Sequence, residues 1–278
     1  KSRSSLVEFT KRTMPDYVVG AMHDMIGAKL EDCASGKIRR LIIEAPRRHG
    51  KSELASKRFP AWYVGRSPSK QIICCSYAAD LASDFGREVR NIVSSDGYSK
   101  VFPGAKLSAD STAAGRWHTR DGGVYVAAGV GGPVAGRGAD LLLIDDPIKN
   151  RQEAEPGTVR DTVWDWFRST AYPTLMPDGC IVIITTRWHE DDLVGRLLDL
   201  QEDLWERVTL PALSGGRALS PERYPIDALH EIRATIGERE WNAQYQQNPT
   251  PDEGAFFQRQ WLGWYRNVER VVQGSLAI

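Results

Sequence analysis

The sequence predicts an α/β fold, with a doubly wound, mainly parallel sheet and helices on both faces, from two observations. First, five short runs are continuously apolar and rich in β-branched residues, which is the pattern of strands covered on both faces. The runs are 41–43, 71–75, 124–127, 141–144 and 181–184. Second, helix-like segments alternate with them, at 51–64, 79–94, 157–170 and 190–200. Such alternation favours right-handed crossovers and therefore parallel neighbours.

The two ends of the chain also read as helical. Apolar positions at helical spacing predict a helix over 15–35, and Gly36 is its expected stop. The elements expected later are a strand at 205–213, helices at 225–236 and 237–246, and a linker-like stretch at 247–255. We therefore expect an N-terminal helical segment that packs on the core, the core itself, a helical lid or linker subdomain, and the start of a C-terminal region. These parts are 1–36, 37–213, 214–255 and 256–278.

Length and composition limit the classes to which the protein can belong. A chain of 278 residues with 41% hydrophobic residues can bury one large core or two modest ones, which argues against disorder. The 36 basic and 36 acidic residues balance, so any contact with nucleic acid must come from a local basic patch. Candidate patches are Lys37 with Arg39 and Arg40, Arg47 with Arg48, Arg87 with Arg90, and Arg116 with His118 and Arg120.

The apolar runs and the cysteines point to a soluble intracellular protein. The longest apolar run, around 141–144, is far shorter than the roughly 20 residues that span a bilayer, so we expect no membrane association. Cysteines occur at 33, 74, 75 and 180, without the paired spacing of a zinc site or the density of a disulfide scaffold. We expect them to be reduced core residues.

A phosphate-binding loop is the clearest motif. Residues 45–52 read Ala-Pro-Arg-Arg-His-Gly-Lys-Ser and stand between a strand and a helix, matching GxxxxGK[ST] except for the first glycine. Gly50 lets the backbone close on phosphates at a helix N-terminus. Lys51 would reach the β- and γ-phosphates of ATP, and the Ser52 hydroxyl would bind Mg²⁺. Pro46 and His49 complete the expected nucleotide-binding loop.

Two arginines inside this loop are unusual. Arg47 and Arg48 would add positive charge beside a nucleotide that Lys51 already serves. Either of them could sense charge or stabilise the transition state. The alternative is an arginine that pairs with a nearby carboxylate.

A second motif ends the apolar run 141–144 with two adjacent carboxylates. Ligands bind at the carboxyl ends of strands in open α/β sheets, so this run has the form of a Walker B element. Asp145 would hold Mg²⁺, and Asp146 would polarise the attacking water. Glutamate is commoner at the second position, so Glu153 or Glu155 stays open as the base if the following loop folds back.

Two further segments are expected near the phosphates. The glycine-rich stretch 129–138 carries a single charge, Arg137, which could reach a phosphate in its own site or in a neighbouring subunit; a plain tight connection is the alternative. The last apolar run ends in Thr185 and Thr186, whose hydroxyls could bond a phosphate or its attacking water and release it on hydrolysis. The run 189–192 could suggest a metal site, but Asp191 and Asp192 fit the first turn of the next helix, where the helix dipole favours acids.

Taken together, these motifs resemble the ATPase domain of tailed-phage terminase large subunits. The resemblance covers about residues 15–257 and also includes the late Gln-Tyr-Gln-Gln-Asn-Pro segment at 244–249. The stretches that carry the resemblance are 46–52, 136–140, 144–147 and 185–192. No piece alone is specific, but their combination and order are. The resemblance implies a P-loop NTPase of the ASCE, RecA-like class.

The resemblance also implies a function. It predicts an ATP-driven motor that hydrolyses ATP with Mg²⁺ and moves double-stranded DNA, without sequence preference, into a procapsid. Expected partners are the portal, the procapsid, the small terminase subunit and further copies of the chain in a ring, although the isolated chain can be a monomer. The expected location is the host cytoplasm, with transient attachment to the procapsid. Arg137 would be a trans-acting arginine finger, and Thr185, Thr186 and Arg187 would form a coupling motif.

Large subunits of this family carry a second, RNase H-like nuclease domain that uses several carboxylates. The last residues, 271–278, contain no acid, so we expect a fragment without the nuclease that does not cut DNA. Two other functions remain open on the motifs. One is another DNA-acting P-loop ATPase such as a helicase or translocase, and the other is a non-catalytic nucleotide-binding assembly module.

Overall fold

The fold is built on a seven-stranded sheet in the order β3-β4-β2-β5-β6-β1-β7. A computed structural model describes residues 1–111 and 113–250. The strands of this sheet are β1 (Arg40–Glu44), β2 (Gln71–Ser76), β3 (Arg116–His118), β4 (Val124–Gly129), β5 (Ala139–Asp145), β6 (Leu175–Thr185) and β7 (Glu206–Thr209). Neighbouring strands run parallel, except that β3 is antiparallel to β4 at one edge. The predicted doubly wound, mainly parallel sheet is confirmed.

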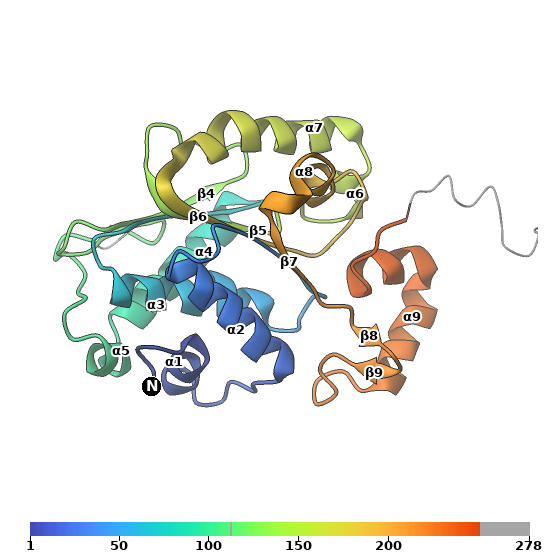
Figure 1. The fold of residues 1–278 in the computed structure, drawn as a ribbon, viewed down its shortest axis with the longest axis horizontal. Helices are drawn as coiled ribbons and strands as arrows, with labels where there is room; N and C mark the ends of the chain where they lie inside the picture. Colours follow the sequence, from blue (N-terminus) through green and yellow to red (C-terminus); the bar gives the residue numbers. More distant parts are fainter. Residues whose placement is uncertain (112, 251–278) are drawn as a thin grey trace, which may run out of the picture.

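Helices cover both faces of the sheet (Figure 1). One face carries α1 (Leu6–Thr13), α2 (Ala21–Ala34), η1 (Glu53–Arg58), α3 (Phe59–Arg66), α4 (Ala79–Val93) and α5 (Asp96–Val101). The other carries α6 (Arg151–Ala154), α7 (Gly157–Trp166), η2 (Phe167–Ala171), η3 (Tyr172–Thr174), α8 (Leu193–Gln201) and η4 (Glu202–Leu204). Helix α4 shows why these segments are helical, because its buried side chains recur every three or four residues and form one apolar face.

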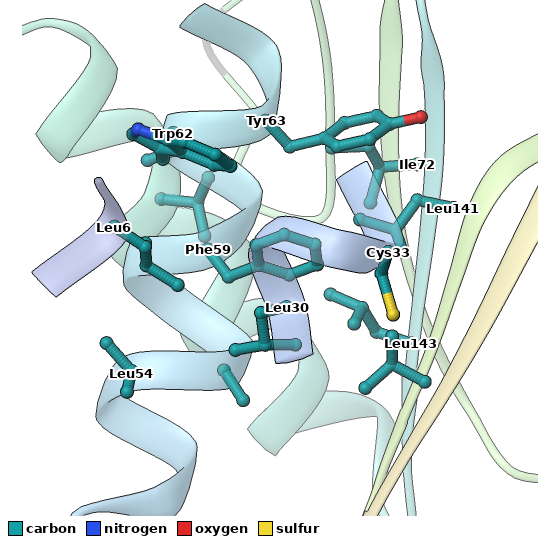
Figure 2. Packing of buried hydrophobic residues seen from close by; sticks show 14 of the residues in the cluster. Leu6, Leu30, Cys33, Leu54, Phe59, Trp62, Tyr63, Ile72, Leu141 and Leu143 are labelled. Carbon is teal, nitrogen blue, oxygen red and sulfur yellow. The ribbon is translucent and has the colours of Figure 1, made fainter. Parts of the chain in front are cut away.

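Alternate residues of each central strand enter different apolar cores. In β5, Leu141 and Leu143 pack under α2 and α3, where Figure 2 shows them close to Cys33 and Ile72. Leu142 and Ile144 point to the opposite face, toward α7 and α8. This alternation follows from the two-residue period of a strand. It explains why the strands are continuously apolar in sequence.

Several predicted boundaries were wrong. Helix α2 begins at Ala21 rather than at 15, and Val18, expected on its apolar face, is 61% exposed. Its expected stop is confirmed, since Gly36 adopts a left-handed φ of 78° that favours glycine. The strand expected at 205–213 is shorter, as β7, and strand β3 was not predicted at all.

The chain after the sheet forms a small unit of its own packing, which we call the C-terminal unit (residues 212–250). It contains β8 (Leu213–Ser214), β9 (Arg217–Ala218), α9 (Ile226–Glu240) and η5 (Trp241–Tyr245) around a separate apolar cluster. Gly237 has a φ of 80° and breaks α9 near its end, at the place where the sequence predicted one helix to follow another. Figure 1 shows this unit beside the sheet. The expected region 256–278 lies outside the described residues.

Two other expectations concern the core and the membrane. All four cysteines are buried and free, as predicted. In the described parts of the chain, every helix is too short or too polar to cross a lipid bilayer.

Candidate active site

The predicted phosphate-binding loop connects β1 to η1, where it forms a tight turn of strand into helix. Gly50 has a φ of 89°, and a Cβ on it would lie 2.9 Å from Nε2 of His23, so only glycine fits there. Arg48 is also left-handed, with a φ of 59°. Turns of this kind let successive backbone N–H groups face one side, which favours anion binding.

The loop meets the end of β5 through direct hydrogen bonds. The Ser52 hydroxyl donates to Oδ1 of Asp145 over 3.2 Å, and the Ser56 hydroxyl donates to Oδ2 over 2.5 Å. The Lys51 ammonium, which is buried, lies 3.4 Å from Oδ2 of Asp146. The two sequence motifs, about ninety residues apart, thus share one site.

Sheet order explains why these side chains converge. Strand β6 lies between β1 and β5, and the carboxyl ends of parallel strands meet at one edge of the sheet. The end of β6 therefore stands between the loop and the acids. There Thr186 accepts a hydrogen bond from Nζ of Lys51 over 2.7 Å, and its backbone N–H donates to Oδ1 of Asp146 over 2.7 Å.

The acids differ in environment. Asp145 is 1% exposed, and burial together with the negative charge of Asp146 raises its pKa to about 6, against the attraction of Lys51. Asp146 has a φ of 44°, which is strained for a residue with a side chain and holds its carboxylate toward β6. A buried carboxylate that is costly to ionise would gain from a cation beside it.

A pocket of about 860 Å³ opens over these groups. It is lined by Arg47, Arg48, Gly50, Lys51, Ser52, Glu53, Tyr77, Leu81, Phe85, Asp145, Asp146, Lys149, Asn150 and Arg223. Most charged side chains in this lining are basic, so the pocket suits an anionic ligand.

The oxygen donors fit a magnesium ion that is held jointly with phosphates. Mg²⁺ in phosphate-binding sites uses one or two protein oxygens and completes its shell with phosphate and water. Ser52 and Asp145 supply such oxygens. Among the described residues, no group of three or more His, Cys, Asp or Glu side chains is arranged to hold a metal ion.

The two loop arginines have different surroundings. Arg47 donates to the carbonyl of Lys149 over 2.7 Å, and its guanidinium lies 4.5 Å from the ring centre of Trp188. The Arg48 side chain lines the pocket and makes no hydrogen bond or ion pair with the described residues. Arg48 is therefore freer to reach a ligand than Arg47. Neither pairs with a carboxylate in the described chain, which was the alternative considered from sequence.

Pro46 and His49 lie outside the pocket lining. Both are buried, and His49 packs behind the loop with its Nδ1 2.8 Å from the carbonyl of Arg47. Pro46 and His49 therefore support the loop and do not contact a ligand in the pocket.

Arg137 also lies outside this pocket. It lines a separate cavity of about 710 Å³ together with Arg116 and the glycine-rich stretch at the end of β4. No hydrogen bond or ion pair joins its side chain to any residue that the structure describes. Tyr77 lines both cavities, so the two are neighbours.

Arg187, expected in the coupling motif, is part of a buried ion-pair network. Its guanidinium binds Glu44 over 2.8 Å and Asp192 over 2.8 Å, and Glu44 also binds Arg207 and Thr209. The charges of these acids raise the pKa of Arg187 above its already high ordinary value, although burial acts in the opposite direction. Arg187 thus connects the ends of β1, β6 and β7 to α8.

The other candidates near the site have structural partners. The Thr185 hydroxyl donates to the carbonyl of Thr186 over 3.1 Å. Glu155 pairs with Arg151 and Arg239, and Glu153 accepts from the N–H of Lys149, and neither acid lines the pocket. The first turn of α8, expected to contain Asp191 and Asp192, holds neither acid. Asp192 is instead the N-cap and accepts from Gly195, and Asp191 lies before the helix and pairs with arginines.

Sequence reasoning missed several residues of the site, of which Tyr77, Asn150 and Arg223 line the pocket and Ser56 bonds the Asp145 carboxylate. Tyr77 and Asn150 follow β2 and β5, and their places after predicted strands were an available signal. Ser56 lies one turn of helix beyond Ser52, a spacing that also predicts its direction. Arg223 comes from the C-terminal unit and belongs to no recognisable sequence motif.

Comparison with known proteins assigns the chain to a family. A family model described as "Terminase large subunit, T4likevirus-type, N-terminal" matches residues 42–264. No curated protein sequence matches the chain.

Solved structures share the fold at low sequence identity. The large terminase of bacteriophage HK97 superposes with a TM-score of 0.61 at 12% identity, over 89% of this chain and 55% of that one. This chain therefore spans about half the length of that protein. The large terminase ATPase domain of Thermus phage P74-26 gives a TM-score of 0.61 at 15% identity, over 87% of this chain and 98% of that domain. Because the family model matches far more than half of its residues, the chain belongs to the family of terminase large subunits.

Proposed function

We propose that this chain is the ATP-hydrolysing motor of a DNA-packaging machine. One observation carries the proposal: the Ser52 hydroxyl bonds the Asp145 carboxylate, with the buried Lys51 ammonium beside them. A loop that cradles phosphates and an acid that shares their magnesium must lie this close in any P-loop enzyme. Membership of the terminase large-subunit family supports a role in DNA packaging.

Each residue of the site has a role in this proposal. The loop amides and Lys51 would bind the phosphate chain, and Ser52 and Asp145 would hold Mg²⁺, which would neutralise charge on the phosphates. Asp146 orients and polarises the attacking water. Its Oδ1 is held by the N–H of Thr186, so the water-activating carboxylate is positioned by β6.

Thr186 supplies the first step of coupling. Its hydroxyl accepts a hydrogen bond from the Lys51 ammonium, so this bond forms or breaks as the ammonium moves. A γ-phosphate would compete for the ammonium, and its loss on hydrolysis would return Lys51 to Thr186. The neighbouring Arg187 connects this end of β6 to α8 through its ion pair with Asp192. Its ion pair with Glu44 connects it to β1 and, through the other bonds of Glu44, to β7.

Arg137 is proposed to act on a neighbouring subunit. It lies beside its own nucleotide pocket but does not line it, and its side chain has no recorded partner in the described chain. An arginine with these properties suits an arginine finger delivered in trans. This role requires further copies of the chain, as in a ring on a portal.

Movement of DNA is proposed to use phosphate contacts that ignore sequence, since packaging must accept any sequence. Binding should therefore weaken as salt rises. The small terminase subunit, the portal and the procapsid remain proposed partners, and the host cytoplasm the proposed location. Strand-displacement assays separate this motor from a helicase, because a packaging motor should not unwind the duplex.

The test is turnover of ATP by the variant Lys51→Ala. We expect hydrolysis to be abolished, because the variant lacks the ammonium that binds the phosphates. Lys11→Ala is the matched control, since Lys11 lies on α1 and pairs with Glu8, and neither residue lines the pocket. Near-normal hydrolysis by Lys51→Ala would remove the proposal, and DNA- or procapsid-stimulated turnover of the wild type would exclude a non-catalytic module.

A further inference from the structure

The C-terminal unit reaches the phosphate-binding loop through two neighbouring residues, Arg223 and Tyr224. They lie in a turn before α9 in which the carbonyl of Ser220 accepts both backbone N–H groups, over 3.1 and 2.8 Å. Tyr224 also packs against the apolar cluster of the C-terminal unit. The turn and this packing fix both side chains relative to α9.

Tyr224 docks on the outer side of the loop. Its ring stacks on the imidazole of His49, with ring centres 4.6 Å apart and planes 17° from parallel. His49 is 1% exposed, and burial lowers its pKa below the ordinary value, so the ring is neutral at pH 7. The stack is therefore an apolar contact between two aromatic rings. It brings the residue before Tyr224 to the mouth of the pocket.

Arg223 is placed at this mouth with most of its donors unused. One of its N–H groups donates to the carbonyl of Arg48 over 2.8 Å, and its side chain lines the pocket together with Gly50 and Lys51. A guanidinium carries five N–H donors. Within the part of the chain that the structure describes, no carboxylate pairs with Arg223. Its charge also acts on the loop, because it adds to burial in lowering the pKa of His49.

We propose that Arg223 binds the phosphate chain of the nucleotide and so makes the C-terminal unit part of the binding site. The inference rests on the proposed function, since it needs a nucleotide in this pocket. Arginine is suited to phosphate because its planar donors can bond two oxygens at once. The hydrogen bond to Arg48 holds the guanidinium beside the loop, where the phosphates would lie.

The consequence is a direct connection between pocket occupancy and the C-terminal unit. Without nucleotide, this unit contacts the loop through the Tyr224 stack and the bond to the Arg48 carbonyl. With nucleotide, Arg223 adds contacts to a ligand that the core also binds. Binding should therefore hold α9 more firmly against the core, and loss of phosphate should loosen it.

The experiment compares the wild type with Arg223→Gln and the control Arg217→Gln. Arg217 is an exposed arginine on β9 in the same unit, away from the pocket. Affinity for a fluorescent, non-hydrolysable ATP analogue with Mg²⁺ is measured by anisotropy. Removing a charged hydrogen bond should weaken binding about tenfold or more in Arg223→Gln and leave the control unchanged.

Hydrogen exchange of α9 provides a second readout that a structural role would not produce. We expect the analogue to slow exchange in the wild type and in the control but not in Arg223→Gln, each compared with the same protein without analogue. The comparison is made within each protein because Arg223→Gln also loses the bond to the Arg48 carbonyl.

Three results would overturn the proposal. Wild-type affinity in Arg223→Gln would refute it and leave the proposed function intact. Equal slowing of α9 exchange by the analogue in this variant and in the wild type would show that Arg223 does not connect the nucleotide to the unit. Absence of analogue binding by the wild type would refute both this inference and the proposed function.

Discussion

The buried network around Glu44 predicts a large loss of stability from a single atom replacement, Glu44→Gln. The Glu44 carboxylate is 0% exposed and accepts hydrogen bonds from Arg187, Arg207 and Thr209. Glutamine keeps the shape but removes the negative charge. Arg187, itself buried, would keep only Asp192 as an acidic partner among the described residues. Breaking a buried ion pair by neutralising one member costs about 3–5 kcal/mol.

That cost is large for this protein. Domains are stable by about 5–15 kcal/mol, and each kcal/mol moves the melting temperature of a chain of this size by about 2–4 °C. We therefore expect Tm to fall by about 6–20 °C. The assay is urea unfolding followed by circular dichroism at pH 7, with thermal melts as a second measure.

The matched control is Glu206→Gln, the same change on β7. Glu206 pairs with Lys29, and both side chains are a third or more exposed. Exposed pairs contribute less than about 1 kcal/mol. If Glu44→Gln lost no more stability than this control, the reasoning about the buried network would be refuted.

The effect also has a definite pH dependence. Burial raises the pKa of Glu44, but Arg207, Arg187 and Thr209 lower it more, so that the net pKa lies below its ordinary value. A lowered carboxyl pKa gives stability that is present above the unfolded value of about 4.3 and is lost as pH falls through the folded value. The difference between wild type and Glu44→Gln should therefore shrink in acid.

Three other predictions concern the site. Arg137→Ala subunits, inactive alone, should regain ATPase activity when mixed with Lys51→Ala subunits, because each supplies what the other lacks; no rescue in mixed samples would argue against action in trans. The pKa of Asp145, raised to about 6, means that the empty protein is stabilised by this group below about pH 4 and loses that stability as pH rises through 6. Asp145→Asn should remove this loss, about 3 kcal/mol, in unfolding experiments between pH 3 and 8, and identical pH profiles would count against the raised pKa. Ser56→Ala removes a hydrogen bond to the same buried carboxylate and should cost about 1.5–3 kcal/mol at pH 7, whereas a change within 0.5 kcal/mol would mean that the bond contributes little.

The sequence predicted the central sheet because its strands bury both faces and therefore lack polar residues. It predicted the loop and the acids of β5 as one site because parallel strands end at a common edge. Strand β3 was missed since it is three residues long, at an edge, and carries polar residues on both sides of Trp117. Local pattern cannot identify a strand whose stability comes from one neighbour.

Residues that act through long-range contacts were the least predictable. Arg187 was expected to be a coupling residue from its motif, but its partner Glu44 lies far away in sequence. Arg207, which binds the same carboxylate, is also distant, and only the register of β1 with β6 and β7 brings the three together. Arg223 enters the pocket because the C-terminal unit folds back over the loop, more than 170 residues earlier in the chain. Neither contact has a local sequence signal.

The most direct test of the account is the effect of Mg²⁺ on nucleotide affinity in the wild type and in Asp145→Asn. The variant removes a buried charge, so its fold should not be weakened. We predict that Mg²⁺ tightens binding of a non-hydrolysable ATP analogue to the wild type and that this gain disappears in the variant. An equal gain from Mg²⁺ in both proteins would contradict the claim that Asp145 and the phosphate-binding loop share one ion.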